Sequence, residues 1–115
     1  MVDVEQYSPR RGDVVWLNFQ PQAGREQSGR RPAVVLSNSN YNRVVGLALF
    51  CSITSKQKGY PFEVDLPANF PISGVILVDQ VKSLDWKTRE ASFIGKLDPK
   101  TMEKIVELIG KILEI

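Results

Sequence analysis

Residues 13–19 have the sequence DVVWLNF, in which β-branched and aromatic side chains predominate. This composition favours a β-strand, and so does the apolar run PAVVLS at residues 32–37. Similar short patterns recur along the chain, separated by polar turn segments, at residues 46–53, 62–66, 74–78, 81–84 and 91–97. Short strands at this close spacing are typical of small antiparallel barrels. We therefore expect a mainly β fold, with the sheet closed or nearly closed on itself.

The remaining segments fit a single domain that spans residues 1–115, because the sequence has no repeat, no linker and no second core pattern. We expect residues 1–9 to form a loose arm. The polar stretch at residues 20–30 contains two glycines and a proline and lacks apolar periodicity, so it predicts a long loop. Loops of this length are uncommon in compact domains and are usually functional or disordered. Residues 38–42 form a polar turn that suits one turn of helix.

The end of the chain changes its hydrophobic period. Asp98 is a good N-cap and Pro99 suits the first helical position. Beyond them, apolar side chains recur with helical spacing. This pattern predicts a C-terminal helix over residues 98–113, packed across the barrel as a lid.

The composition excludes several classes of protein. The chain is 43% hydrophobic and 24% charged, which is ordinary for a soluble globular domain. It has no histidine, which excludes Ser-His-Asp catalysis, histidine acid–base pairs and histidine-ligated zinc. Its one cysteine, Cys51, cannot close an intrachain disulfide and is expected in the core. The acidic start lacks the apolar core of a signal peptide, and no apolar run is long enough to cross a bilayer, so we expect a cytoplasmic protein.

The formal net charge of +2 is unevenly distributed. Residues 1–60 carry eight basic and four acidic side chains, whereas residues 61–115 carry seven basic and nine acidic ones. A local positive field of this kind attracts polyanions such as nucleic acid. A solvated surface of mixed charge explains the same composition equally well, so charge alone leaves both interpretations open.

Arg31 and Thr54 are candidate phosphate-binding residues. Arg31 precedes Pro32, which favours an extended backbone, and a guanidinium on a fixed backbone suits phosphate recognition. Thr54 follows a predicted strand, where its hydroxyl is placed to bond a phosphate or ribose oxygen. Each has a structural alternative, because exposed arginines often form surface ion pairs and threonines often cap loops.

Two further segments carry groups suited to RNA. The loop SKQKGY at residues 55–60 combines lysines, amides and an aromatic ring, which are used for phosphate neutralisation, base-edge contacts and stacking. Its alternative interpretation is a solvated hairpin tip. Asp79 and Gln80 interrupt an apolar stretch, either at a bulge or facing a site. Trp16 suits a core or interface position, and Trp86 a contact with a partner.

Four motifs occur together in the order and spacing of one known family. They are RGDVVW, GREQSGRRPAVVLS, KGYPFEV and DQVKSL, at residues 11–16, 24–37, 58–64 and 79–84. On these motifs the chain resembles the MazF/PemK family of toxin endoribonucleases, and the resemblance covers nearly the whole chain from Arg10 onward. It implies a small SH3-like barrel of the PemK/MazF/CcdB type with a C-terminal helix.

The resemblance also implies an activity and partners. The expected reaction is sequence-specific cleavage of single-stranded RNA, usually mRNA, without metal or other cofactor, leaving a 2′,3′-cyclic phosphate and a 5′-hydroxyl. A homodimer and a neutralising MazE-like antitoxin are expected as well. The family's catalytic arginine and threonine fall on Arg31 and Thr54. The residues expected to bind RNA are Arg25, Glu26, Gln27, Arg30, Ser55, Lys56, Lys58, Asp79 and Gln80.

Two departures from the family pattern exclude some of the mechanisms that its members could use. Some PemK-type members have a histidine where this chain has Arg25, and some have an arginine where it has Leu77. A mechanism that needs either residue cannot apply here, so Arg31 and Thr54 become the central pair. Two alternatives stay open at this point: a non-catalytic RNA-binding barrel, and a CcdB-like toxin that binds gyrase, although this chain lacks the C-terminal tryptophan that CcdB uses.

Overall fold

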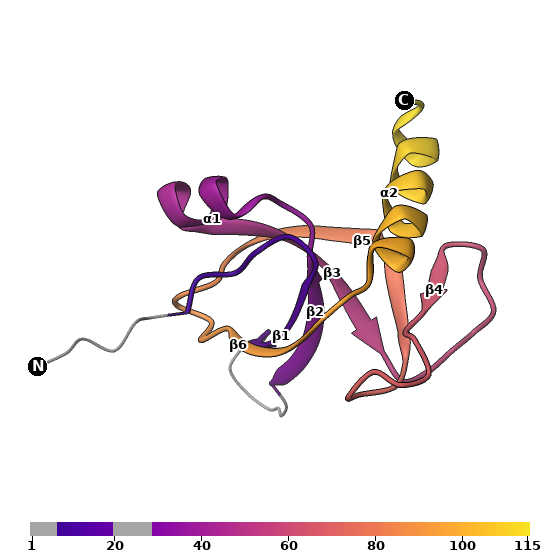
Figure 1. Ribbon diagram of the computed structural model, residues 1–115, viewed down its shortest axis with the longest axis horizontal. Coiled ribbons are helices and arrows are strands. Elements are labelled where there is room, and N and C mark those ends of the chain that lie inside the picture. Colours follow the sequence, from indigo (N-terminus) through magenta and orange to yellow (C-terminus); the bar gives the residue numbers. More distant parts are fainter. Residues whose placement is uncertain (1–6, 20–28) are drawn as a thin grey trace, which may run out of the picture.

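The computed structural model describes residues 7–19 and 29–115 of the chain. Six strands form one antiparallel sheet in the order β4-β5-β3-β2-β1-β6, which curls around a hydrophobic core (Figure 1). The small antiparallel fold with a C-terminal helix agrees with the prediction. The sheet is a curled half-barrel in which β4 and β6 are the edges. In chain order the elements are β1 (Asp13–Asn18), β2 (Arg30–Val35), α1 (Ser39–Val45), β3 (Leu47–Thr54), β4 (Glu63–Asp65), β5 (Val75–Asp85), β6 (Ser92–Lys96) and α2 (Pro99–Leu113).

The central strands are covered on both faces, which explains why they are apolar almost without interruption. Val14 pairs with Val34 across β1 and β2, and both belong to the core cluster that α2 helps to close. The next pair, Val15 and Ala33, points the other way into a second cluster that includes Trp86. Successive side chains of a strand point to opposite faces, so a strand buried on both sides has no polar alternation.

β5 differs from the prediction of two strands separated by Asp79 and Gln80. It is one long strand that pairs with β3 along its length. The register shifts between Cys51 and Ile53 of β3, which leaves residues 77–80 of β5 in the irregular part of the ladder. Such an irregularity bends a strand without ending it, so Asp79 and Gln80 lie at a bend and not in a loop.

α1 is longer than the helical turn predicted for residues 38–42, and it fixes the segment before β1. The buried Asn42 donates through its side-chain amide to the carbonyl oxygens of Pro9 (2.9 Å) and Ser37 (3.1 Å). Tyr7 donates its hydroxyl to Asp13. The part of the expected loose arm that the structure describes, residues 7–9, is therefore held against the domain, whereas residues 1–6 lie outside the described part.

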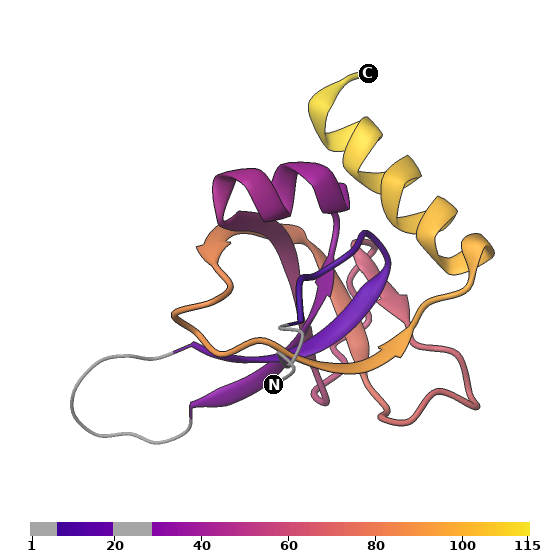
Figure 2. The same ribbon diagram turned by 60° about the vertical axis from the view of Figure 1, so that its left-hand side comes forward.

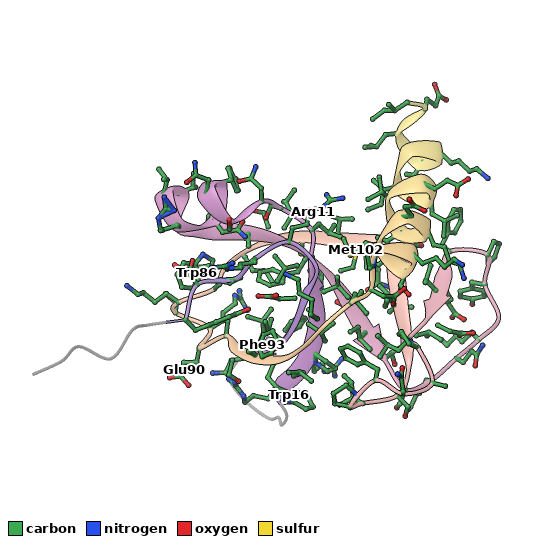
Figure 3. The ribbon with its side chains drawn as sticks, viewed as in Figure 1. Arg11, Trp16, Trp86, Glu90, Phe93 and Met102 are labelled. Atoms are coloured by element: carbon green, nitrogen blue, oxygen red, sulfur yellow. The ribbon has the colours of Figure 1, made fainter. Side chains whose placement is uncertain are left out.

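Trp86 is a core residue and not a contact surface for a partner. Its side chain is only 8% exposed, and its indole nitrogen donates to the backbone oxygen of Asn42 at 2.9 Å. Figure 3 shows it beside α1. The polar sequence around Trp86 belongs to the turn after β5, and this turn folds the indole back onto the sheet.

α2 begins as predicted, with Asp98 as its N-cap and Pro99 in the first turn. Both helices lie in the upper part of the view in Figures 1 and 2, but α2 packs on the first core cluster, whereas α1 contacts Trp86 of the second. Most of α2 packs on the core, through the buried Met102 and Ile105 and the partly buried Leu108 and Ile109, whereas its last turn projects away and leaves Leu113 exposed. The helix is therefore a lid over all but its last turn. Within residues 7–19 and 29–115, no helix is long and apolar enough to cross a membrane.

Candidate active site

Arg31 and Thr54 line the same hollow from neighbouring strands. The ladder between β2 and β3 ends at the pair of Ala33 and Ser52, which are two residues away from Arg31 and from Thr54 along their strands. The hollow has a volume of about 450 Å³. The structure thus brings together the two residues that the sequence analysis assigned to catalysis.

The Thr54 hydroxyl is oriented by its own backbone. Its oxygen accepts a hydrogen bond from the amide of Lys56 at 3.1 Å. A hydroxyl has one hydrogen to donate besides its acceptor lone pairs, so the bond from Lys56 leaves the Thr54 hydrogen available to a ligand. This is the arrangement needed for donation to a phosphate oxygen.

A second, smaller hollow of about 220 Å³ adjoins the first and shares Thr54 and Lys56 with it. The bend of β5 places Asp79 and Gln80 on its wall, and the loop after β3 contributes Lys58. Ser55 lines the larger hollow. Residues from strands β1 to β5 and from the loop after β3, separate in the sequence, therefore form one continuous surface around Thr54.

The charged groups of this surface are suited to a polyanion. Arg31, Lys56 and Lys58 are exposed cations along the two hollows. Of the acidic side chains that the structure describes, Asp79 and Glu63 line them. Among the described residues, no group of three His, Cys, Asp or Glu side chains gathers in a way that would hold a metal ion.

Cys51 lies close to this surface but is buried in the core, as the sequence analysis predicts. It is fully buried, and burial raises the pKa of its thiol to about 12, with a further contribution from the negative charge of Asp79. Its sulfur donates to the backbone oxygen of Val78 at 3.8 Å. A thiol that stays protonated is a poor nucleophile, so Cys51 fills space and takes no part in the site.

Arg30 is not brought into this group, although it was expected to bind RNA. Its guanidinium donates to the side chain of Asn18, to the backbone oxygen of Glu90 and to the hydroxyl of Ser92, each at 2.9 Å. These bonds connect β2 to β1, to the turn before β6 and to the first residue of β6. Neighbouring residues of a strand point to opposite faces, so Arg30 and Arg31 serve different sides of the sheet. Arg25, Glu26 and Gln27 lie outside the described residues.

Two residues of the surface were not anticipated. Trp16 is half-buried and lines the larger hollow with Arg31, and Figure 3 shows it at the end of the sheet away from Trp86. The alternation of side chains along β1 predicts which face of the sheet Trp16 lies on, but only the neighbouring strand β2 shows that Arg31 borders the same hollow. Glu63 lines the smaller hollow, and its sequence signal is its position three residues after the basic segment at residues 55–60.

Comparison with known proteins identifies the family. The model of the PemK-like, MazF-like toxins of type II toxin–antitoxin systems matches residues 10–113. The chain belongs to this family. Its members include the endoribonuclease toxin MazF of Escherichia coli K12, which is 43% identical to this toxin over 110 residues, covering 96% of this chain and 98% of the relative.

Two other relatives extend the comparison. The endoribonuclease EndoA of Bacillus subtilis strain 168 is 35% identical to the toxin over 105 residues, covering 87% of this chain and 90% of the relative. A crystal structure of MazE-MazF from Deinococcus radiodurans contains a chain that is 48% identical and superposes with a TM-score of 0.91, covering 96% of this chain and 99% of that one. Fold and sequence therefore agree over nearly the whole length of the toxin.

Proposed function

We propose that this toxin cleaves single-stranded RNA at a short specific sequence, without a metal ion, and that mRNA is its main substrate. The observation that carries the proposal is the convergence of Arg31 and Thr54 on one hollow beside a basic loop. The products would be a 2′,3′-cyclic phosphate and a 5′-hydroxyl. In this reaction the ribose 2′-oxygen forms a bond to phosphorus and the bond to the 5′-oxygen breaks.

The two central side chains suit the charge that develops in this step. Arg31 would place its two-pronged guanidinium on the non-bridging phosphate oxygens, where the interaction strengthens as negative charge grows. Thr54 would donate its free hydroxyl hydrogen to the same phosphate. Both groups come from strand ends, which hold them more rigidly than a free loop does.

The reaction also moves protons, one from the 2′-hydroxyl and one to the 5′-oxygen. A guanidinium stays protonated in proteins, so Arg31 stabilises charge and another group accepts the 2′ proton. The candidates are Asp79, Glu26 and water, since the chain has no histidine. Asp79 is supported by its position on the wall of the smaller hollow, which Thr54 also lines.

The remaining polar residues would bind the RNA on either side of the cleaved bond. Ser55, Lys56 and Lys58 would contact phosphates, and Asp79 and Gln80 would contact base edges. We propose that Arg25, Glu26 and Gln27, which lie outside the described residues, also bind the RNA. We assign Arg30 a supporting role instead, because its guanidinium is occupied by three hydrogen bonds within the domain.

We further propose that the toxin acts in the cytoplasm as a homodimer and is neutralised by a MazE-like antitoxin. The support for the antitoxin is the MazE-MazF crystal structure from Deinococcus radiodurans, which contains a chain 48% identical to this toxin. Size-exclusion chromatography with light scattering tests the dimer. Co-expression with a MazE-like antitoxin tests neutralisation.

One experiment separates cleavage from the alternatives. Purified toxin is incubated with a long RNA of mixed sequence, with and without excess EDTA, and the new 5′ ends are mapped. We expect cleavage at one short motif, equal in both conditions, and its loss in Arg31→Ala. Arg43→Ala is the matched control, because Arg43 is an exposed arginine of α1 that donates to Asn40 and lines neither hollow.

Each alternative has its own outcome in this experiment. RNA binding without new 5′ ends would support a non-catalytic RNA-binding barrel, and inhibition of gyrase without RNA binding would support a CcdB-like toxin. Cleavage by a folded Arg31→Ala variant at the wild-type rate would refute the catalytic assignment. Loss of cleavage in EDTA that added metal restores would refute metal independence.

A further inference from the structure

Glu63 lies at the candidate site with its carboxylate bonded to the backbone of the basic loop. It is the first residue of β4, and its side chain lines the smaller hollow beside Lys58 and Asp79. One carboxylate oxygen accepts from the amide of Gly59 at 2.9 Å, and the other accepts from the amide of Lys58 at 3.1 Å. The carboxylate therefore accepts hydrogen bonds from two successive backbone amides of the segment at residues 55–60, which we call the basic loop.

The conformation of the basic loop depends on these two hydrogen bonds. Gly59 has a φ of 78°, in the left-handed region that glycine adopts most readily. The backbone amide of Glu63 in turn donates to the carbonyl oxygen of Tyr60 at 3.1 Å. Hydrogen bonds to an ionised carboxylate are stronger than those between neutral groups, so Glu63 supplies the main polar anchor of this end of the loop.

The other end of the basic loop is anchored at the catalytic pair. The Thr54 hydroxyl oxygen accepts from the amide of Lys56 at 3.1 Å. With its two ends held by Thr54 and Glu63, the loop presents Lys56 and Lys58 on the walls of the hollows. Two exposed lysines on an unanchored loop would have to be ordered during binding, which costs conformational entropy.

We propose that Glu63 is a positioning residue for RNA binding, whose carboxylate holds the basic loop in the conformation that places Lys56 and Lys58 against the RNA backbone. The inference rests on the proposed function, since it assigns binding of the RNA backbone to this loop. Glu63 acts through backbone amides and does not touch the reacting phosphate. Its removal therefore weakens binding more than it slows the chemical step.

The direction of the change in RNA affinity on removal of Glu63 distinguishes a positioning role from an effect of its charge alone. Glu63 is an acidic group beside a surface that would bind a polyanion, so on charge alone its removal should tighten RNA binding. Loss of the loop anchor has the opposite effect. Asp65 is the matched control: it is an exposed acid on the same strand, and it lines neither hollow of the site.

The test compares Glu63→Ala, Glu63→Gln and Asp65→Ala with the wild-type toxin. The probe is a single-stranded RNA that carries the mapped cleavage motif with a 2′-deoxynucleotide at the cleaved step, which prevents attack. For Glu63→Ala we expect Kd for this RNA, and KM for the cleavable one, to rise about ten-fold, with kcat within about two-fold. For Asp65→Ala we expect Kd to be unchanged or lower.

Glu63→Gln should give an intermediate Kd, because its amide oxygen still accepts from one backbone amide while its NH₂ group faces the other. Hydrogen exchange of the Lys58 and Gly59 amides, measured without RNA, should be faster in Glu63→Ala and unchanged in Asp65→Ala. If Glu63→Ala fails to fold, the nearly isosteric Glu63→Gln variant provides the same comparison.

Three outcomes would overturn the assignment of Glu63: RNA binding by Glu63→Ala as tight as that of Asp65→Ala, a loss confined to kcat, or unchanged exchange at Lys58 and Gly59. Failure of the proposed function looks different, because the wild-type toxin itself would then neither bind nor cut the RNA. Exchange at the two amides is measured without RNA, so it reports on the loop anchor in either case.

Discussion

The backbone carbonyl oxygen of Thr54 lies 2.6 Å from the point that a Cβ atom on Gly74 would occupy. Gly74 has a φ of 142°, which side chains rarely adopt, and it immediately precedes Val75, the pairing partner of Thr54. Only glycine allows the two backbones to approach this closely. The position of a proposed catalytic residue therefore depends on a glycine directly before another strand.

Gly74→Ala should displace Thr54 and reduce kcat, because the new methyl group meets backbone and not a movable side chain. We expect a loss of about ten-fold or more in kcat together with a lower Tm. The matched control is Gly46→Ala, which has a similarly positive φ of 84° at the end of α1 but no atom within 4 Å of the added Cβ. It should lower Tm without changing kcat; an unchanged kcat in Gly74→Ala would contradict the prediction.

Thr54→Val should abolish most cleavage while RNA binding persists. Valine keeps the shape of threonine but has no hydroxyl to donate, and loss of one such donor to developing charge typically costs about 100-fold in rate. Single-turnover cleavage and binding of the 2′-deoxy RNA measure the two effects separately. Thr54→Ser, which keeps the hydroxyl, should recover most of the rate; wild-type cleavage by Thr54→Val would remove Thr54 from the mechanism.

Asn42→Ala should destabilise the domain without altering the site. The buried Asn42 amide satisfies the carbonyl oxygens of Pro9 and Ser37, and unpaired buried polar groups are costly, so we expect a loss of about 2 kcal/mol in the free energy of unfolding. Urea denaturation measures it. Asn40→Ala, an exposed position on the same helix, should change stability by less than about 0.5 kcal/mol; equal effects of the two variants would contradict the prediction.

Asp98 should make stability depend on pH in the acid range. Hydrogen bonds from the side chain and backbone of Thr101 lower the pKa of the Asp98 carboxyl from its ordinary value of 3.8. A lowered folded-state pKa stabilises the fold above the unfolded-state pKa, and this stabilisation is lost as pH falls through the folded-state value.

The comparison that isolates this effect is wild type against Asp98→Asn, since asparagine is also a good N-cap but does not titrate. The difference in their free energies of unfolding should be constant above pH of about 5 and shrink below about 4. Asp98→Ala, which lacks the cap acceptor, should be less stable than Asp98→Asn by an amount independent of pH. If the difference in free energy of unfolding between wild type and Asp98→Asn stayed constant down to the lowest pH, Asp98 would not contribute to the pH dependence of stability.

Much of the fold follows from local patterns that survive in the structure. The strand DVVWLNF at residues 13–19 and the Asp98–Pro99 helix start were predictable because propensity and capping act over a few residues. The continuity of β5 through Asp79 was not, because a strand that bends and a strand that ends have similar local sequences. Pairing with β3 on both sides of the bend decides between them.

The candidate site likewise combines features that the sequence predicts with features that only the tertiary structure shows. Arg31 and Thr54 could be named from their motif positions, but nothing local to either residue shows that they share a hollow. Arg30 illustrates the converse: it is adjacent to Arg31 and has the same chemistry, yet the alternation of β2 turns it toward Asn18 and Ser92. Glu63 was visible only as a polar residue of a short strand until its bonds to the basic loop were seen.

The sequence by itself determined the family, the β-rich architecture and the absence of histidine chemistry, and it supplied the proposal of Arg31 and Thr54, because motifs, composition and strand propensity are properties of the linear chain. Tertiary structure alone decided which arginine faces the hollow, which glycine lets Thr54 take its place, and which carboxylate anchors the basic loop. Those features depend on strand register and on contacts between residues distant in the chain, where one residue of shift exchanges the two faces of a strand.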